Sequence, residues 1–182
     1  MPMQTVSGAA ERQRTLSISV VGAIGFAVAL AAASQIAIPL PNTPVPITLQ
    51  PMIVVLAGLW LGPVAGAASM LLFLAAGAMG LPVFTPMGAP GIARLLGPTG
   101  GYLLAYPIAA YVAGRLAPSG ASFRRRFGAA SAGMFAIYCG GFAQLVLLTG
   151  SLERAALLGV LPFVALDVCK ALIAAALRPS RI

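Results

Sequence analysis

Long apolar segments dominate this 182-residue sequence, and they are broken mainly by glycine, proline and a few arginines. Hydrophobic residues make up 60% of the chain and charged residues only 8%, too few to cover a soluble domain. A membrane-spanning helix needs about 20 apolar residues, so the length leaves room for about six spans. The alternating pattern of a transmembrane β-barrel is absent from the sequence. We therefore predict an all-α integral membrane protein, with an N-terminal segment at 1–15, one six-helix transmembrane domain at 16–178 and a tail at 179–182.

Proline and glycine mark the ends of the expected spans. The proline-rich segment 39–46 must follow the first span, because proline in a helix interior removes a backbone hydrogen bond. Gly62 and Pro63 interrupt the next apolar stretch and predict two short spans, whereas one long broken helix would leave five spans in all. A Gly/Pro-rich loop at 81–101 comes next, and Pro162 lies inside the last span. The six expected spans are 16–38, 48–61, 64–80, 102–117, 127–148 and 155–177.

The arginines divide unevenly between the two sides of this topology. With both termini on one side, eight arginines lie there and two lie opposite, so the termini side is expected to be cytoplasmic. An odd number of spans would spoil this division, which favours six over five. Trp60 is expected at the cytoplasmic interface as an aromatic anchor. The larger set is Arg12, Arg14, Arg115, Arg124, Arg125, Arg126, Arg178 and Arg181, and the smaller set is Arg94 and Arg154.

The net charge of +8 does not indicate a nucleic-acid partner, because the basic residues stand at the ends of apolar segments rather than on one polar face. We expect instead a multi-pass protein of the cytoplasmic membrane, surrounded by lipid.

The side chains that most enzymes use are scarce. The chain has three acidic residues and no histidine, which excludes Ser–His and Cys–His nucleophiles and histidine-ligated metals. No Walker A motif is present, so we expect no ATP site on this chain. Cys139 and Cys169 lie inside apolar segments and are interpreted as small packing residues. We expect no enzyme activity, no metal and no cofactor.

Asp167 and Lys170 are the exceptions to the apolar pattern. They lie three residues apart and therefore share one face of the last expected helix. Charges at bilayer depth cost several kcal/mol, so such residues usually face a cavity, a partner or a pathway. A carboxylate and an ammonium side by side suit a ligand with both an N–H and a carbonyl, such as an amide or a ureide. Two alternatives stay open, a structural ion pair in a scaffold protein and a lysine that snorkels to the cytoplasm.

Arg94 is the other charge that could approach this pair, from the outer side. In the Gly/Pro-rich loop it is either a solvated surface residue or a clamp for an anionic ligand group. Gly97 and Gly100 allow a tight turn beside it. Tyr102 either lines a pocket or anchors its helix at the interface.

Ala23, Ala27 and Ala31 form a stripe of small residues with a spacing of four on the first expected helix. Such a stripe lets another helix approach closely. It serves either packing within the bundle or docking onto a separate membrane subunit, and the spacing does not separate the two.

Five segments in this order resemble the BioY family, the biotin-specific substrate-binding components of energy-coupling factor (ECF) transporters. The likeness extends from about residue 37 to residue 177 and departs from the family pattern at 85–87, where a more Gly-rich stretch is expected. The matching segments are 44–50 (PVPITLQ), 58–63 (GLWLGP), 80–84 (GLPVF), 96–102 (LGPTGGY) and 159–163, which leads to Asp167 and Lys170.

This resemblance implies a six-helix fold that binds biotin near the outer face, beneath the loop between the third and fourth helices. It implies that Asp167 and Lys170 hold the ureido ring and that Arg94 meets the valerate carboxylate. The segment with Gly97, Thr99, Gly100 and Tyr102 would complete the site. The first helix would dock onto a transmembrane coupling protein driven by two ATPase subunits, with a homo-oligomer that works alone as the alternative.

Overall fold

The structure, a computed structural model, describes residues 3–177, which form eight helices and one two-stranded hairpin. The elements are α1 (Met3–Gln35), β1 (Ala37–Ile38), β2 (Ile47–Thr48), α2 (Gln50–Leu61), α3 (Pro63–Ala78), α4 (Ile92–Leu96), α5 (Gly100–Leu116), α6 (Phe123–Thr149), α7 (Leu152–Gly159) and α8 (Val164–Ala176). The all-helical architecture expected from the sequence is confirmed, apart from the short antiparallel hairpin that pairs Ala37 with Thr48.

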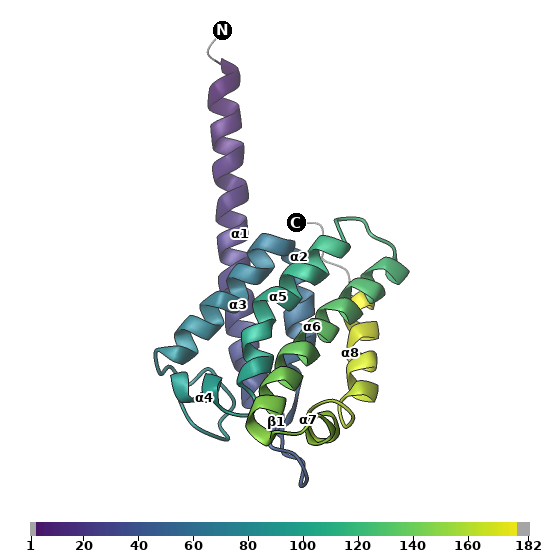
Figure 1. The fold of residues 1–182 in the computed structure, drawn as a ribbon. Helices are drawn as coiled ribbons and strands as arrows, with labels where there is room; N and C mark the ends of the chain where they lie inside the picture. The colour runs from purple at the N-terminus through teal and green to yellow at the C-terminus, as the bar shows by residue number, and fades with distance from the viewer. Residues whose placement is uncertain (1–2, 178–182) are drawn as a thin grey trace.

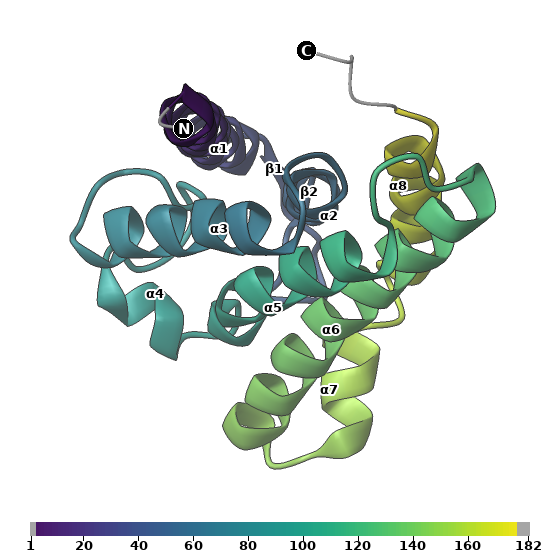
Figure 2. The same ribbon diagram turned by 90° about the horizontal axis from the view of Figure 1, so that it is seen from above.

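The long helices run side by side between two ends of a bundle (Figure 1). Helix α1 begins and α8 ends at the same end, which we call the termini end. The hairpin, α4 and α7 lie at the opposite end, which we call the hairpin end. Viewed along the bundle, α5 lies in the middle and packs against α2, α3 and α6 (Figure 2). Helices α1, α2, α3, α5, α6 and α8 run between these two ends, whereas the short helices α4 and α7 stay at the hairpin end (Figure 1).

The break at Gly62 separates two helices that pack against each other, so the alternative of one long broken helix is wrong. Gly62 adopts a φ of 82°, which glycine tolerates best, and Pro63 opens α3. The two helices cross closely, since a Cβ on Gly66 would lie 2.9 Å from the Cα of Gly58. The sequence prediction of two short helices at this place is confirmed.

The last expected span is not one helix. It is divided into α7 and α8, which meet at an angle of 51°. Pro162 has no backbone N–H, so helical hydrogen bonding cannot continue through it. The Tyr102 hydroxyl donates to the Gly159 carbonyl oxygen at 2.7 Å and so satisfies an acceptor at the end of α7. The span expected at 155–177 therefore consists of two helices, which meet at the proline that the sequence placed inside it.

Several helix boundaries differ from those of the expected spans, and two of these differences have a clear local cause. Helix α1 ends at Gln35 instead of residue 38, because Ala37 and Ile38 pair with β2. Helix α6 begins at Phe123 instead of residue 127, because the Ser122 hydroxyl caps it by accepting from the Arg125 backbone N–H.

The surface of the described chain is rich in large apolar side chains. Val21, Val64 and Leu147 are 70%, 74% and 84% exposed, as expected of groups that meet lipid rather than water. Cys139 and Cys169 are also exposed, so their interpretation as buried packing residues was wrong. Among the described residues, the segments Ser17–Gln35 and Phe123–Thr149 are long and apolar enough to cross a membrane, and the bent pair α7–α8 makes a third if counted as one span. The protein is therefore a membrane protein, in which α2 and α3 are apolar but shorter.

Three helices are tied together at the termini end. Trp60, near the end of α2, donates from Nε1 to the Leu177 carbonyl oxygen at 3.1 Å, and Arg126 at the start of α6 donates to the same oxygen. These donors satisfy a carbonyl that the end of α8 leaves without a helical partner. The Trp60 ring also packs edge-on against Phe26 of α1, with 5.9 Å between the ring centroids. Trp60 thus lies at the end where the sequence predicted an anchor, and it ties helices together there.

Candidate functional site

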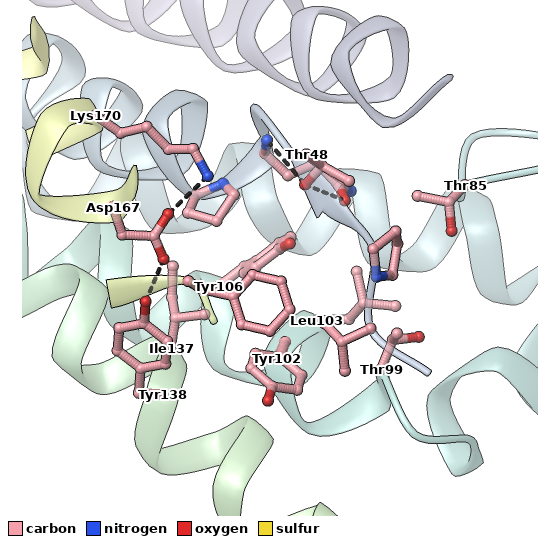
Figure 3. Close-up of a pocket in the computed structure, with 15 residues that line it drawn as sticks. Thr48, Thr85, Thr99, Tyr102, Leu103, Tyr106, Ile137, Tyr138, Asp167 and Lys170 are labelled. Atoms are coloured by element: carbon pink, nitrogen blue, oxygen red, sulfur yellow. Dashed lines mark hydrogen bonds and ion pairs between the residues drawn. The ribbon is translucent and has the colours of Figure 1, made fainter. Parts of the chain in front are cut away.

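Asp167 and Lys170 lie side by side in the interior of the bundle. Lys170 Nζ is 2.6 Å from Asp167 Oδ1, and the two residues are only 8% and 6% exposed (Figure 3). Asp167 stands in the first turn of α8, where the helix dipole favours a negative charge. The break at Pro162 therefore also allows a new helix, α8, to begin close to Asp167, so that a helix N-terminus lies beside this carboxylate.

A third residue completes the pair. The Tyr138 hydroxyl, from α6, donates to Asp167 Oδ2 at 2.5 Å, so each carboxylate oxygen accepts from a different side chain. Sequence reasoning missed Tyr138, because a tyrosine inside an apolar helix has the pattern of a packing residue. Its proximity to Asp167 depends on how α6 packs against α8.

The pair lines a cavity, and the walls of this cavity come from six parts of the chain: the hairpin, the start of α2, the loop after α3, and helices α5, α6 and α8. Most of the wall is aromatic or aliphatic, with the charged pair and the Tyr138 hydroxyl on one side and Thr85 and Thr99 on the opposite side (Figure 3). The lining residues are Val45, Pro46, Thr48, Gln50, Pro51, Thr85, Thr99, Tyr102, Leu103, Tyr106, Ile137, Tyr138, Phe163, Asp167 and Lys170. A few fixed polar groups in an apolar enclosure are typical of a small-molecule site.

Gln50 contributes a polar group that the sequence analysis did not single out. It is 4% exposed, and its Oε1 accepts from the Thr48 hydroxyl at 3.2 Å. Its Nε2 has no hydrogen-bond partner among the described residues. A buried amide donor beside a cavity suits a ligand acceptor, since an unmet buried donor costs free energy. One signal in the sequence pointed to Gln50, which is the last residue of the segment 44–50 that resembles the BioY family.

The predicted loop residues divide into those that line the cavity and those that support it. Thr99 and Tyr102 line it, so Tyr102 takes the first of the two roles that its sequence position allowed. Gly97 and Gly100 do not, and they act through the backbone. A Cβ on Gly100 would lie 1.9 Å from the Leu95 carbonyl oxygen, so only glycine fits there.

Arg94 lies behind the cavity wall. It is 7% exposed, so the alternative of a solvated surface arginine was wrong. Its Nη2 donates to the Thr85 carbonyl oxygen, and its guanidinium packs on Gly88. Burial lowers the pKa of the Arg94 guanidinium, which still stays charged at neutral pH. Thr85 lines the cavity, so Arg94 is one residue removed from it.

The alanine stripe of α1 faces the protein's own interior. Ala23 is 5% exposed, and Ala27 and Ala31 pack against the hydrophobic core. In this structure the three residues serve packing within the bundle, one of the two roles that their spacing allowed. Among the described residues, no group of three or more potential metal ligands is present.

The fold and the cavity are those of a helical membrane protein with a partly open cavity of mixed polar and apolar lining. The model of the BioY family matches residues 5–181. A relative named probable biotin transporter BioY, from Pyrococcus horikoshii, is 44% identical over 128 residues, covering 70% of this chain and 75% of the relative. The biotin transporter BioY of Thermotoga maritima is 38% identical over 138 residues, covering 76% and 81%.

A solved structure is also similar, the crystal structure of the S-component for biotin from an ECF-type ABC transporter. It superposes with a TM-score of 0.77 at 26% identity, covering 92% of this chain and 89% of that one. The chain belongs to the BioY family, as the motif resemblance predicted.

Proposed function

We propose that this chain binds biotin inside the membrane and serves as the substrate-binding subunit of a biotin uptake system. The observation that carries the proposal is the buried Asp167–Lys170 pair, which lines an otherwise largely apolar cavity. A ureido ring offers N–H groups to the carboxylate and a carbonyl to the ammonium, while its fused ring and side chain suit the aromatic wall. The names of the relatives, biotin transporters rather than enzymes, support the same function.

The proposal includes six membrane passes with both termini in the cytoplasm. The six helices that run between the two ends of the bundle support this count, and so do Arg115, Arg124 and Arg125 near the termini end. The biotin cavity would then open toward the outer side, at the hairpin end. A reporter that is active only in the cytoplasm, fused after residue 182, should be active, whereas one that is active only outside should be silent.

We further propose that the energy for uptake comes from a separate ECF module with a coupling protein and two ATPase subunits. The description of the similar crystal structure as part of an ECF-type ABC transporter supports this partnership. Docking through Ala23, Ala27 and Ala31 stays a prediction from the family resemblance, and it would require α1 to turn or separate from its present neighbours. Function as a homo-oligomer is the alternative.

The binding proposal is tested by titrating biotin into the purified protein and three variants. Asp167→Asn and Lys170→Ala each remove a charged partner of the ureido ring and should weaken binding about 10- to 100-fold. Glu153→Gln is the matched control, since it neutralises an exposed carboxylate on α7, and it should bind like the wild type. Wild-type affinity in both site variants would refute the assignment of the site.

The competing function is a membrane scaffold in which the pair is purely structural, a reading that the direct 2.6 Å contact between the two charges also allows. A scaffold would gain no thermal stability from biotin, whereas each site variant should lose stability under either function, because one buried charge stays uncompensated. A biotin-binding protein should melt at a higher temperature as biotin is added, because a ligand that binds only the folded state stabilises it.

A further inference from the structure

The carboxylate of Asp167 is held from two helices. Lys170, on the same helix α8, binds Oδ1, whereas Tyr138 reaches Oδ2 from α6. An aspartate carboxylate turns readily about its last side-chain torsion, which has a broad, two-fold preference. One partner leaves this rotation free, and two partners on different oxygens fix the plane of the group.

Tyr138 and Asp167 also separate two hollows of the protein. Both line the cavity, and both line a second, open groove between α6 and α8. The rest of that groove is almost entirely apolar, with Met134, Phe135, Phe142, Val164 and Val168 among its walls. Phe135 and Val168 are 69% and 46% exposed on the outer surface of these helices, so the groove faces the lipid.

Asp167 lies in the wall between the cavity and the lipid-facing groove, so its carboxylate oxygens are best satisfied by donors on the protein and cavity side. The carboxylate has two oxygens with about four lone-pair positions between them, and those turned toward hydrocarbon would go unsatisfied. The Tyr138 hydroxyl occupies one position on Oδ2, and its ring extends from there toward α6 (Figure 3). Lys170 occupies a position on Oδ1, so positions on both oxygens remain for a ligand in the cavity, which Asp167 lines.

We propose that Tyr138 is a positioning residue for the ligand site, in that its hydroxyl orients Asp167 toward a ureido N–H in the cavity and its ring closes the wall between the cavity and the lipid-facing groove. This inference rests on the proposed binding of biotin. It assigns the recognition of the N–H group to a pair of helices, α6 and α8, rather than to α8 alone.

The test compares Tyr138→Phe with Tyr111→Phe in the purified full-length protein. Tyr111, 46% exposed on α5, is outside the cavity, so its variant loses the same hydroxyl without touching the site. Tyr138→Phe should weaken biotin binding by about tenfold or more, the usual effect of losing a hydrogen bond to a charged group. Tyr111→Phe should bind within about twofold of the wild type, a change too small to count as the loss of such a hydrogen bond.

A second measurement separates positioning from a purely structural role. The carbonyl stretch of biotin labelled with ¹³C in the ureido carbonyl reports how strongly the protein polarises the bound ring. At saturating biotin, a reoriented Asp167 should shift this band to higher frequency in Tyr138→Phe and leave it unchanged in Tyr111→Phe. A structural role would lower the melting temperature of the ligand-free variant with no shift of the band.

The outcomes are distinct. If the wild type binds no biotin, the proposed function fails and the inference falls with it. If the wild type binds biotin and Tyr138→Phe keeps both its affinity and its band position, the inference is overturned while the proposed function stands.

Discussion

Replacing both members of the charged pair, as Asp167→Leu with Lys170→Met, should separate stability from binding. The single variant Lys170→Met leaves the Asp167 carboxylate buried at 6% exposure without its cation. Breaking a buried ion pair in this way costs about 3–5 kcal/mol, because one charge stays uncompensated. At about 2–4 °C per kcal/mol for a chain of this length, its melting temperature should fall by roughly 10 °C.

The double variant removes both charges and puts apolar groups of similar volume in their place. Replacement of a buried ion pair by well-packed apolar side chains is often neutral, or stabilising by about 1–4 kcal/mol. We therefore expect the double variant to melt at or above the wild-type temperature and yet to have lost biotin binding. The assay is a thermal melt in detergent with and without biotin, beside a binding titration.

A double variant that melts as low as Lys170→Met would contradict this expectation. The pair would then be needed for the fold itself, and its burial would not indicate a ligand site. A double variant that still binds biotin would contradict the assignment of these two residues to the ureido ring.

Three further predictions concern the packing of the helices and the surroundings of the site. Gly58→Ala should destabilise the protein by about 1–3 kcal/mol in a thermal melt, because the new Cβ would lie 2.1 Å from the Ala110 carbonyl oxygen where α2 crosses α5. The Gln144 side chain on α6 donates to the Leu95 and Gly97 carbonyl oxygens at 3.0 and 2.6 Å and so holds the segment that leads to Thr99 at the cavity. Gln144→Leu removes these two contacts, so biotin should dissociate faster in a chase experiment while the melting temperature changes little. Arg94→Gln should weaken biotin but not biotin amide if Arg94 meets the valerate carboxylate, and equal losses for both ligands would show that Arg94 only supports Thr85.

The sequence predicted those features that depend on local rules. Gly62 and Pro63 separate two helices because a glycine with positive φ followed by proline ends one helix and starts the next. Asp167 and Lys170 meet because residues three apart share a face of any helix. Both could be read from spacing without knowledge of the fold.

Features that depend on packing between distant segments could not be predicted in this way. Tyr138 is a partner of Asp167 only because α6 lies against α8. At the break near Pro162, the Gly159 carbonyl oxygen at the end of α7 accepts a hydrogen bond from Tyr102, which lies 57 positions earlier in the chain. The burial of Arg94 depends on the course of the loop around Gly88, whose φ is 110°.

The most direct test of the central claim is a calorimetric titration of the purified wild-type protein with biotin. We expect a single saturable site per chain, with competition by desthiobiotin, which retains the ureido ring. Absence of saturable binding to folded protein would contradict the claim that the cavity beside Asp167 and Lys170 is a biotin site.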